Sequence, residues 1–353
     1  MDTINIFLMG CWNKNTCIED KNMDRREHVL SLISENTTNF DFSILLGDNI
    51  YPLKNKKIKT KKNKKGRKKT KKYMRESGEF YRNYLSLVES MTIDSPFDLK
   101  LHVILGNHDV FYDCVKRHQI DQFTTPISNI YERNTMFPTN LANFIFLNSN
   151  NMSEVLDYLE DLDVSTLEDK WLILCAHEPL ISYKPKKKRI FQKLNESKNV
   201  FEILKRLRHH KIAYFCADTH NYQVLEMIEP NYGNSVSNSN YFSLPIIVVG
   251  TGGAKPDSLR GIEDNLEYYE ESDDVHVSII DYQDCYGYAS LQITKNELRV
   301  NYIRCESENN LIIKYLPRKN MLTYKSSFLE KTCDYRNMPK CDVKSLKEFD
   351  TIC

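Results

Sequence analysis

Five apolar segments of the sequence each end in a short cluster of residues that can ligate a metal ion or transfer a proton. The clusters are Cys11-Trp12-Asn13, Asp48-Asn49-Ile50-Tyr51, Asn107-His108-Asp109, His177-Glu178 and Asp218-Thr219-His220-Asn221. Carboxylate, amide and imidazole groups that converge are the ligands that two neighbouring divalent or trivalent ions require. One such cluster would mean little, but five in one chain predict a metal centre.

The segments before these clusters are predicted to be strands, because short apolar runs alternate with amphipathic segments along the chain. They cover Ile4–Met9, Phe42–Leu46, Leu101–Leu105, Trp171–Cys175 and Ile212–Cys216. Further strands are predicted at Phe144–Leu147, Val224–Ile228, Leu244–Val249 and, antiparallel, from Val275 to Ile303, with helices at Asp24–Glu35, Phe80–Val88 and Val200–Leu207. Ligands and metals collect at the carboxyl ends of strands in α/β proteins. We therefore expect an α/β fold, a four-layer α/β/β/α sandwich of two mixed sheets with helices outside.

Charge divides the chain into an acidic body and one basic insert. Between Lys54 and Lys72 there are thirteen basic residues and no acidic ones. Without these thirteen, 36 basic residues stand against 48 acidic ones, a net charge of −12, whereas the whole chain carries +1. The insert contains almost nothing apolar and is predicted to be a disordered loop. It is either a solvated insertion or an electrostatic contact for a polyanion such as nucleic acid, anionic lipid or a phosphorylated substrate.

We assign residues 1–316 to one domain that contains this insert, and residues 317–353 to a C-terminal appendage. The N-terminal segment lacks a basic region before its first apolar run, and no apolar stretch approaches the length of a membrane span. Without an export signal, the ten cysteines are expected to be free thiols in a reducing compartment. These features predict a cytoplasmic protein with no membrane span.

The order and spacing of the motifs resemble those of calcineurin-like metallophosphoesterases. The resemblance rests on Gly47-Asp48-Asn49, Gly106-Asn107-His108-Asp109, the isolated His177 and the closing pair Thr219-His220. Tyr51, Trp12 and the turn Gly250-Thr251-Gly252-Gly253-Ala254 resemble the purple acid phosphatase branch in particular. The similarity extends from about Ile4 to Ile293. It implies hydrolysis of a phosphate ester by a hydroxide bound between two metal ions, which would be iron, zinc or manganese.

The same resemblance implies a role for each matching residue. Asp48 would bridge both ions, with Tyr51 and His220 as ligands of the first ion and Asn107 and His177 as ligands of the second. His108 would lie beside the phosphate and stabilise or protonate the leaving oxygen. Asp109 would hold His108 in the correct tautomer, a supporting role typical of carboxylates behind catalytic histidines.

Two positions depart from the family pattern. Cys11 stands where the family has an aspartate ligand of the first ion, and Asp218 stands where it usually has a histidine. A thiolate suits zinc or iron, and a carboxylate suits manganese or magnesium, so the first position becomes softer and the second harder and more anionic. Alternatively, Cys17, Glu19 or Asp20 supplies the missing ligand.

Three functional interpretations remain open from the sequence. The retained ligands favour an active phosphoesterase with altered metals. The changes at Cys11 and Asp218 instead favour a phosphatase-like scaffold or binding protein that has lost turnover. A third hypothesis is a nuclease or nucleotide phosphodiesterase, in which the insert Lys54–Lys72 attracts a polyanionic substrate.

Overall fold

The computed structural model describes the strands that carry the predicted site and most of what surrounds them. The described residues are 3–12, 40–49, 51, 101–110, 128–167, 169–186, 189–193, 196–229, 242–257, 267–270, 275–283, 285–304, 308–316 and 321–326, with the single positions Val29, Leu32, Ile33, Lys116, Ile120 and Leu259. The basic insert Lys54–Lys72, the predicted helix at Phe80–Val88 and most of the appendage 317–353 lie outside these residues.

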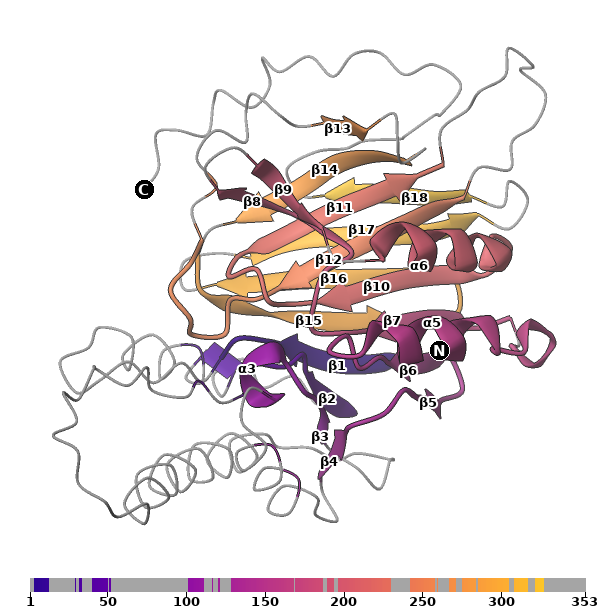
Figure 1. The fold of residues 1–353 in the computed structure, drawn as a ribbon, viewed down its shortest axis with the longest axis horizontal. Coiled ribbons are helices and arrows are strands. Elements are labelled where there is room, and N and C mark those ends of the chain that lie inside the picture. The colour runs from indigo at the N-terminus through magenta and orange to yellow at the C-terminus, as the bar shows by residue number, and fades with distance from the viewer. Residues whose placement is uncertain are drawn as a thin grey trace, which may run out of the picture.

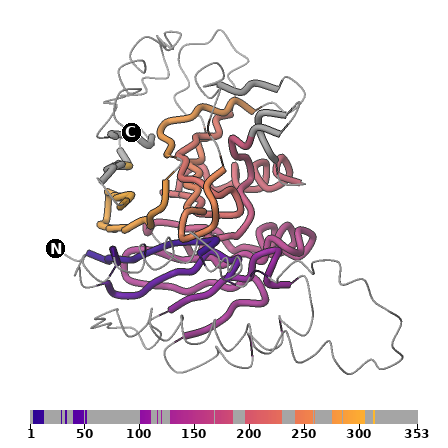
Figure 2. The backbone as a smooth tube through the Cα atoms, turned by 90° about the vertical axis from the view of Figure 1, so that its left-hand side faces the viewer, coloured from indigo at the N-terminus to yellow at the C-terminus, as the bar shows by residue number. Residues whose placement is uncertain are grey.

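The first of two large sheets contains both the N-terminal strands and the last described strands. Its order is β18-β17-β16-β15-β1-β2-β3-β4. The strands are β1 (Ile4–Met9), β2 (Phe42–Leu45), β3 (Leu101–Ile104), β4 (Ser128–Tyr131), β15 (Gly287–Ile293), β16 (Glu297–Arg304), β17 (Glu308–Leu316) and β18 (Met321–Ser326). The strands β1 to β4 run parallel, and β15 pairs antiparallel with β1. In Figure 2 the orange segment of β15 and β16 continues the layer that the indigo β1 begins, whereas β14, also orange, belongs to the second sheet.

The second sheet is built in the same way, with parallel strands at its centre. Its order is β13-β14-β11-β12-β10-β7-β6-β5. The strands are β5 (Thr135–Pro138), β6 (Ala142–Phe146), β7 (Trp171–Cys175), β10 (Lys211–Cys216), β11 (Tyr222–Ile228), β12 (Ser243–Val249), β13 (Glu267–Glu270) and β14 (Val275–Gln283). The strands β6, β7, β10 and β12 are parallel, and β11 is antiparallel to β12. A separate hairpin consists of β8 (Ile181–Lys186) and β9 (Arg189–Lys193).

Alternating side chains divide the apolar core into three layers. One layer lies between the sheets and includes Ile6 and Leu8 of β1 and Phe215 of β10. A second layer lies on the outer face of the second sheet, on the side of the helices. These are α5 (Met152–Glu160), α6 (Ser197–Leu204) and the short 3-10 helices η1 (Val164–Thr166) and η2 (Lys205–Leu207). Figure 1 shows α5 and α6 lying across β7 and β10. The third layer packs Val29 and Ile33 on the outer face of the first sheet.

This arrangement confirms the predicted fold class, an α/β sandwich of two mixed sheets. The predicted strands are all present, although β2 and β3 end one residue earlier than predicted and β6 begins at Ala142. Of the predicted helix Asp24–Glu35, the described positions Val29, Leu32 and Ile33 are helical. β18 lies within the segment assigned to the appendage and pairs with β17, so the division at residue 317 stays a prediction. No helix of the described chain is long and apolar enough to cross a membrane.

Candidate metal centre

The carboxyl ends of the central parallel strands of both sheets meet at one edge. Backbone hydrogen bonds join them directly: the N–H of Gly10 donates to the carbonyl of Val249 at 2.9 Å, and that of Cys11 donates to Gly47 at 3.0 Å. In the second sheet, the N–H of Ala217 donates to the carbonyl of His177 at 2.8 Å. The segments that sequence analysis predicted to converge are therefore fixed to one another through the main chain.

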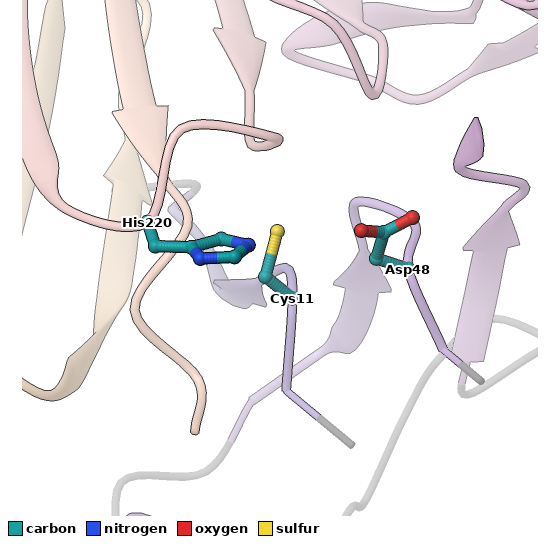
Figure 3. A group of neighbouring side chains, drawn as sticks. All are labelled: Cys11, Asp48 and His220. Carbon is teal, nitrogen blue, oxygen red and sulfur yellow. The ribbon is translucent and has the colours of Figure 1, made fainter. Parts of the chain in front are cut away.

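The first group of side chains consists of Cys11, Asp48 and His220. One ligand atom from each lies within 4.8 Å of the others, with Cys11 and Asp48 buried and His220 partly exposed. Figure 3 shows the Cys11 sulfur between the His220 ring and the Asp48 carboxylate. The Oη of Tyr51 lies 3.3 Å from Nε2 of His220, so the phenol joins this group. Thiol, carboxylate, imidazole and phenol together suit zinc or iron.

The second group surrounds the buried ring of His177. Its Nε2 lies 3.3 Å from Oδ1 of Asp48 and 3.9 Å from Oδ1 of Asp218. The amide nitrogen of Asn107 donates to the same Asp218 oxygen at 3.2 Å. Asp48 contributes to both groups, and Asn107, His177 and Asp218 lie together on its other side. The bridging role that the resemblance implies for Asp48 stays a prediction.

The tautomer of His177 decides whether this group fits a metal ion. Its Nδ1 donates to the carbonyl of Leu46 at 2.8 Å, so in the neutral ring Nε2 carries the lone pair. This buried nitrogen has no hydrogen-bond partner among the described residues. A lone pair that faces two carboxylates requires a proton or a metal ion between them, and backbone anchoring of the distal nitrogen is usual for a histidine ligand. The residues present therefore fit a cation.

The charges in this group act on one another in the metal-free protein. Burial alone would lower the pKa of His177, but the Asp48 and Asp218 carboxylates raise it above its usual value. Burial would raise the pKa of Asp218, yet His177, Lys184 and His220 hold it below its usual value. Both shifts favour the ionised forms, so the group behaves as a set of coupled charges.

For the thiol and the phenol of the first group, the pKa shifts favour the neutral forms. Burial, followed by the charges of Asp48 and Asp218, raises the pKa of Cys11 well above its usual value. Burial and the neighbouring Cys11 and Asp48 do the same for the pKa of Tyr51. Both side chains are therefore neutral without a cation, and they become anionic ligands only when a cation replaces their protons.

His108 and Asp109 follow Asn107 in the short helix α3 (Asn107–Val110) but lie in different surroundings. The His108 ring is 44% exposed and packs on Tyr51 with ring centroids 4.6 Å apart, and its backbone N–H donates to Asp48 at 3.0 Å. Asp109 is buried, and one of its oxygens accepts hydrogen bonds from the backbone N–H groups of Gly106 and Asn49 at 2.8 and 3.1 Å. It thus ties together two of the motifs. The predicted contact of Asp109 with His108 stays a prediction.

Backbone conformation explains why position 47 is a glycine and which residues of the site are strained. Gly47 has φ of 89°, and a Cβ atom there would lie 2.6 Å from Nδ1 of His177 and 2.8 Å from the nitrogen of Gly106. Only glycine allows this approach. Cys11, Asp48 and Asp218 themselves have φ between 52° and 56°, a left-handed conformation that costs non-glycine residues roughly 1 kcal/mol or more. Such strain concentrates at functional sites.

Lys184 is a member of the site that sequence reasoning missed. Its Nζ lies 3.7 Å from Oδ2 of Asp218 and 3.2 Å from Oδ2 of Asp257. No signal in the sequence separates it from the lysines that follow Pro185, because only the path of β8 brings it to the strand ends. The alternative ligands Cys17, Glu19 and Asp20 lie outside the described residues.

The fold and these converging groups define a metallophosphoesterase-like protein. The family model for calcineurin-like phosphoesterases matches residues 4–236, and this chain belongs to that family. The matched region contains every residue of both groups. Membership supports a metal-dependent phosphoesterase in general terms.

A solved structure of low sequence identity has the same fold. A structure of PhoD is 12% identical, with 93% of this chain and 72% of that chain covered and a TM-score of 0.59. A structure of GAP50, described as the anchor in the inner membrane complex of Plasmodium, is 13% identical, with 86% of this chain and 85% of that chain covered and a TM-score of 0.48. No curated protein matches the sequence.

Proposed function

We propose that this protein hydrolyses a phosphate ester at a centre of two metal ions, in the manner of the purple acid phosphatase branch. The observation that carries the proposal is the buried Nε2 of His177, which faces the Asp48 and Asp218 carboxylates without a hydrogen-bond partner among the described residues. Iron, zinc or manganese would fill this place. When bound, these ions supply Lewis-acid activation of water and neutralise charge on the phosphate.

The side chains divide the remaining work. Cys11, Tyr51 and His220 would hold the first ion, Asn107, His177 and Asp218 the second, and Asp48 both. The His108 ring is 44% exposed and lies beside Asp48 and Tyr51, where it would be accessible to a substrate. There its ring donates a hydrogen bond to the phosphate or a proton to the leaving oxygen. Asp109 fixes the Asn49 and Gly106 loops on which Asp48 and His108 are carried.

Metal content and turnover together test this proposal. Protein purified without added metal or chelator is expected to contain about two equivalents of metal and to hydrolyse p-nitrophenyl phosphate. Asp48→Asn should lose metal and lower kcat by roughly a hundredfold or more, because a shared ligand and its charge are removed. Asp157→Asn, on the exposed face of α5, is the matched control and should change neither. Less than half an equivalent in the wild type, not restored by soaking with metal, would contradict the proposal.

A phosphatase-like scaffold without turnover is the second candidate. The observation that favours it is Lys184, whose ammonium lies against Asp218 and supplies positive charge at the second group without a metal ion. On this hypothesis the protein binds little metal, hydrolyses no phosphomonoester with any of several ions, and retains its fold in Asp48→Asn. Efficient turnover that disappears in Asp48→Asn would eliminate it.

A further inference from the structure

The ammonium of Lys184 reaches the Asp218–His220 loop at several points. Besides its contact with the Asp218 carboxylate, Nζ donates to the Asp218 carbonyl at 3.4 Å. It also lies 3.2 Å from Asp257, whose carboxylate accepts the backbone N–H of His220 at 3.1 Å. The backbone N–H of Asp257 in turn donates to the carbonyl of His220 at 2.8 Å. One side chain therefore fixes, directly or through Asp257, a predicted ligand of each metal ion.

The position of Lys184 is set by the strand that carries it. The hydroxyl of Ser182 lies 2.8 Å from that of Thr219, a buried contact one residue from Asp218. The backbone N–H of Tyr183 donates to the Gln223 side chain at 2.8 Å, and the Gln223 amide donates back to the Tyr183 carbonyl at 2.8 Å. These bonds hold β8 against the start of β11, so Lys184 cannot move away from the loop without breaking buried hydrogen bonds.

Charge explains why a lysine belongs there. Asp218 has 13% of its side chain exposed, and its carboxylate and that of Asp48 lie near the same nitrogen of His177, so a carboxylate without a counter-charge at this position would be costly to bury. Its left-handed φ of 52° adds strain that needs support from its surroundings. Lys184, itself 12% exposed, offsets the charge through its contact with Oδ2 of Asp218. It also supports the strained backbone, because it donates a hydrogen bond to the Asp218 carbonyl.

We propose that Lys184 is a built-in counter-cation for Asp218, which holds the loop in place in the metal-free protein and competes with the second metal ion for that carboxylate. The first half of this inference, that Lys184 holds the loop in place, stands on the contacts alone. The second half, that Lys184 competes with the second metal ion, rests on the proposed function. A metal ion at His177 and Asp218 would take over the charge compensation while being repelled by the nearby ammonium. Lys184 thus acts as a positioning residue that weakens binding of the second ion relative to the first.

A double-mutant cycle in metal-free protein tests the first half. Lys184→Met keeps most of the side-chain volume but removes the charge, and is expected to lower the thermal midpoint by roughly 3 to 6 °C. In an Asp218→Asn background the same substitution should cost clearly less, because only the Asp257 carboxylate is then left without the ammonium. Equal losses in the two backgrounds would overturn the counter-cation role.

Addition of Mn²⁺ to the same variants tests the second half. The rise in thermal midpoint with Mn²⁺ is expected to be larger in Lys184→Met than in the wild type, with the second equivalent binding roughly tenfold more tightly by calorimetry. Lys205→Met is the matched control, since Lys205 is 16% exposed and pairs with Glu202 and Glu229 away from the site. Its loss of stability should not be reversed by Mn²⁺.

The outcomes separate this inference from the proposed function. A wild type and variants that all fail to respond to Mn²⁺ would count against the metal centre and against competition, while the metal-free cycle would still decide the role of Lys184 in the loop. A wild type that binds two ions with the same affinities as Lys184→Met would contradict the competition and leave the phosphoesterase proposal intact.

Discussion

The thiol of Cys11 changes what the first group can bind. It lies between Asp48 and His220 on a residue with φ of 53°, so its direction is fixed by a strained turn. Burial raises the pKa of this thiol well above its usual value, which keeps it protonated until a cation replaces the proton. A thiolate that forms only with metal favours zinc, iron or cobalt over manganese at this position.

Cobalt binding should report this thiolate directly. Titration of the metal-free protein with Co²⁺ is expected to produce an intense near-ultraviolet thiolate-to-metal absorption. Cys11→Ser should remove this absorption and weaken binding of the first equivalent by at least roughly tenfold, because a direct ligand is lost. Cys285→Ser is the control, because that sulfur is 4.0 Å from Arg304 and is not part of the group formed by Cys11, Asp48 and His220. An unchanged spectrum in Cys11→Ser would show that Cys11 is not a ligand.

Sequence reasoning predicted several of the side chains that strand order brings together. Asp48, His177 and His220 were predicted because each follows a buried apolar strand, and the ends of parallel strands share one edge of a sheet. Lys184 was not predicted, because its partners Asp218 and Asp257 are distant in sequence and its neighbours include several other lysines. Periodicity carries information about which face a residue occupies, but not about which charged residue fits a given carboxylate.

At the scale of single elements, β14 departs from regular pairing in a way that the sequence did not predict. Its register with β11 shifts between Val224 and Leu225, so that Val224 pairs with Asp281 and Leu225 pairs with Ile279. The side chain of Val224 lies in the core between the sheets, and paired residues face the same side. The bulge therefore turns Asp281 towards the interior, where burial raises the pKa of its carboxyl to about 6.

The cost of this buried carboxyl should depend on pH. Because the pKa in the folded protein is above the unfolded value of 3.8, the protonated form is favoured by folding, and that stability is lost as pH rises from about 4 through 6. Asp281→Asn is expected to raise the free energy of unfolding by about 1 to 2 kcal/mol at pH 7.5 and by clearly less at pH 4.5. Urea unfolding at the two pH values measures this.

The exposed substitution Asp157→Asn provides the reference for that comparison. It should leave the denaturation midpoint unchanged at pH 7.5, where Asp281→Asn raises it. A destabilising effect of Asp281→Asn at pH 7.5 would mean that the Tyr282 N–H, which donates to the Asp281 carboxylate at 2.8 Å, or the nearby Arg304 stabilises the charged form more than burial penalises it.

At the scale of the molecule, the fold class followed from the alternation of apolar strands and amphipathic helices, and the structure confirms it. Which strands pair with one another was harder to predict from the sequence. The sequence did not indicate that β15 would pair with β1, or that the β8–β9 hairpin would form outside both large sheets. Such contacts join residues far apart in the chain and depend on how the two sheets pack, which local patterns do not encode. The same limit applies to the site, because its two sheets are joined by contacts of this kind, such as the hydrogen bond from Gly10 to Val249.

The uneven charge of the whole chain leads to the last prediction. With Lys54–Lys72 the protein carries +1, and without the thirteen basic residues of that segment it carries −12. A body of −12 repels a polyanion, so retention on heparin at low salt should depend on the insert and fall steeply as salt rises. Replacing those thirteen residues with serine, at unchanged length, is expected to abolish retention, whereas reversing the order of the insert should preserve it because its charge is kept. Loss of retention in both variants would mean that a specific sequence, and not charge, makes the contact. Equal retention in both variants would mean that the segment is a solvated insertion without a role in polyanion binding.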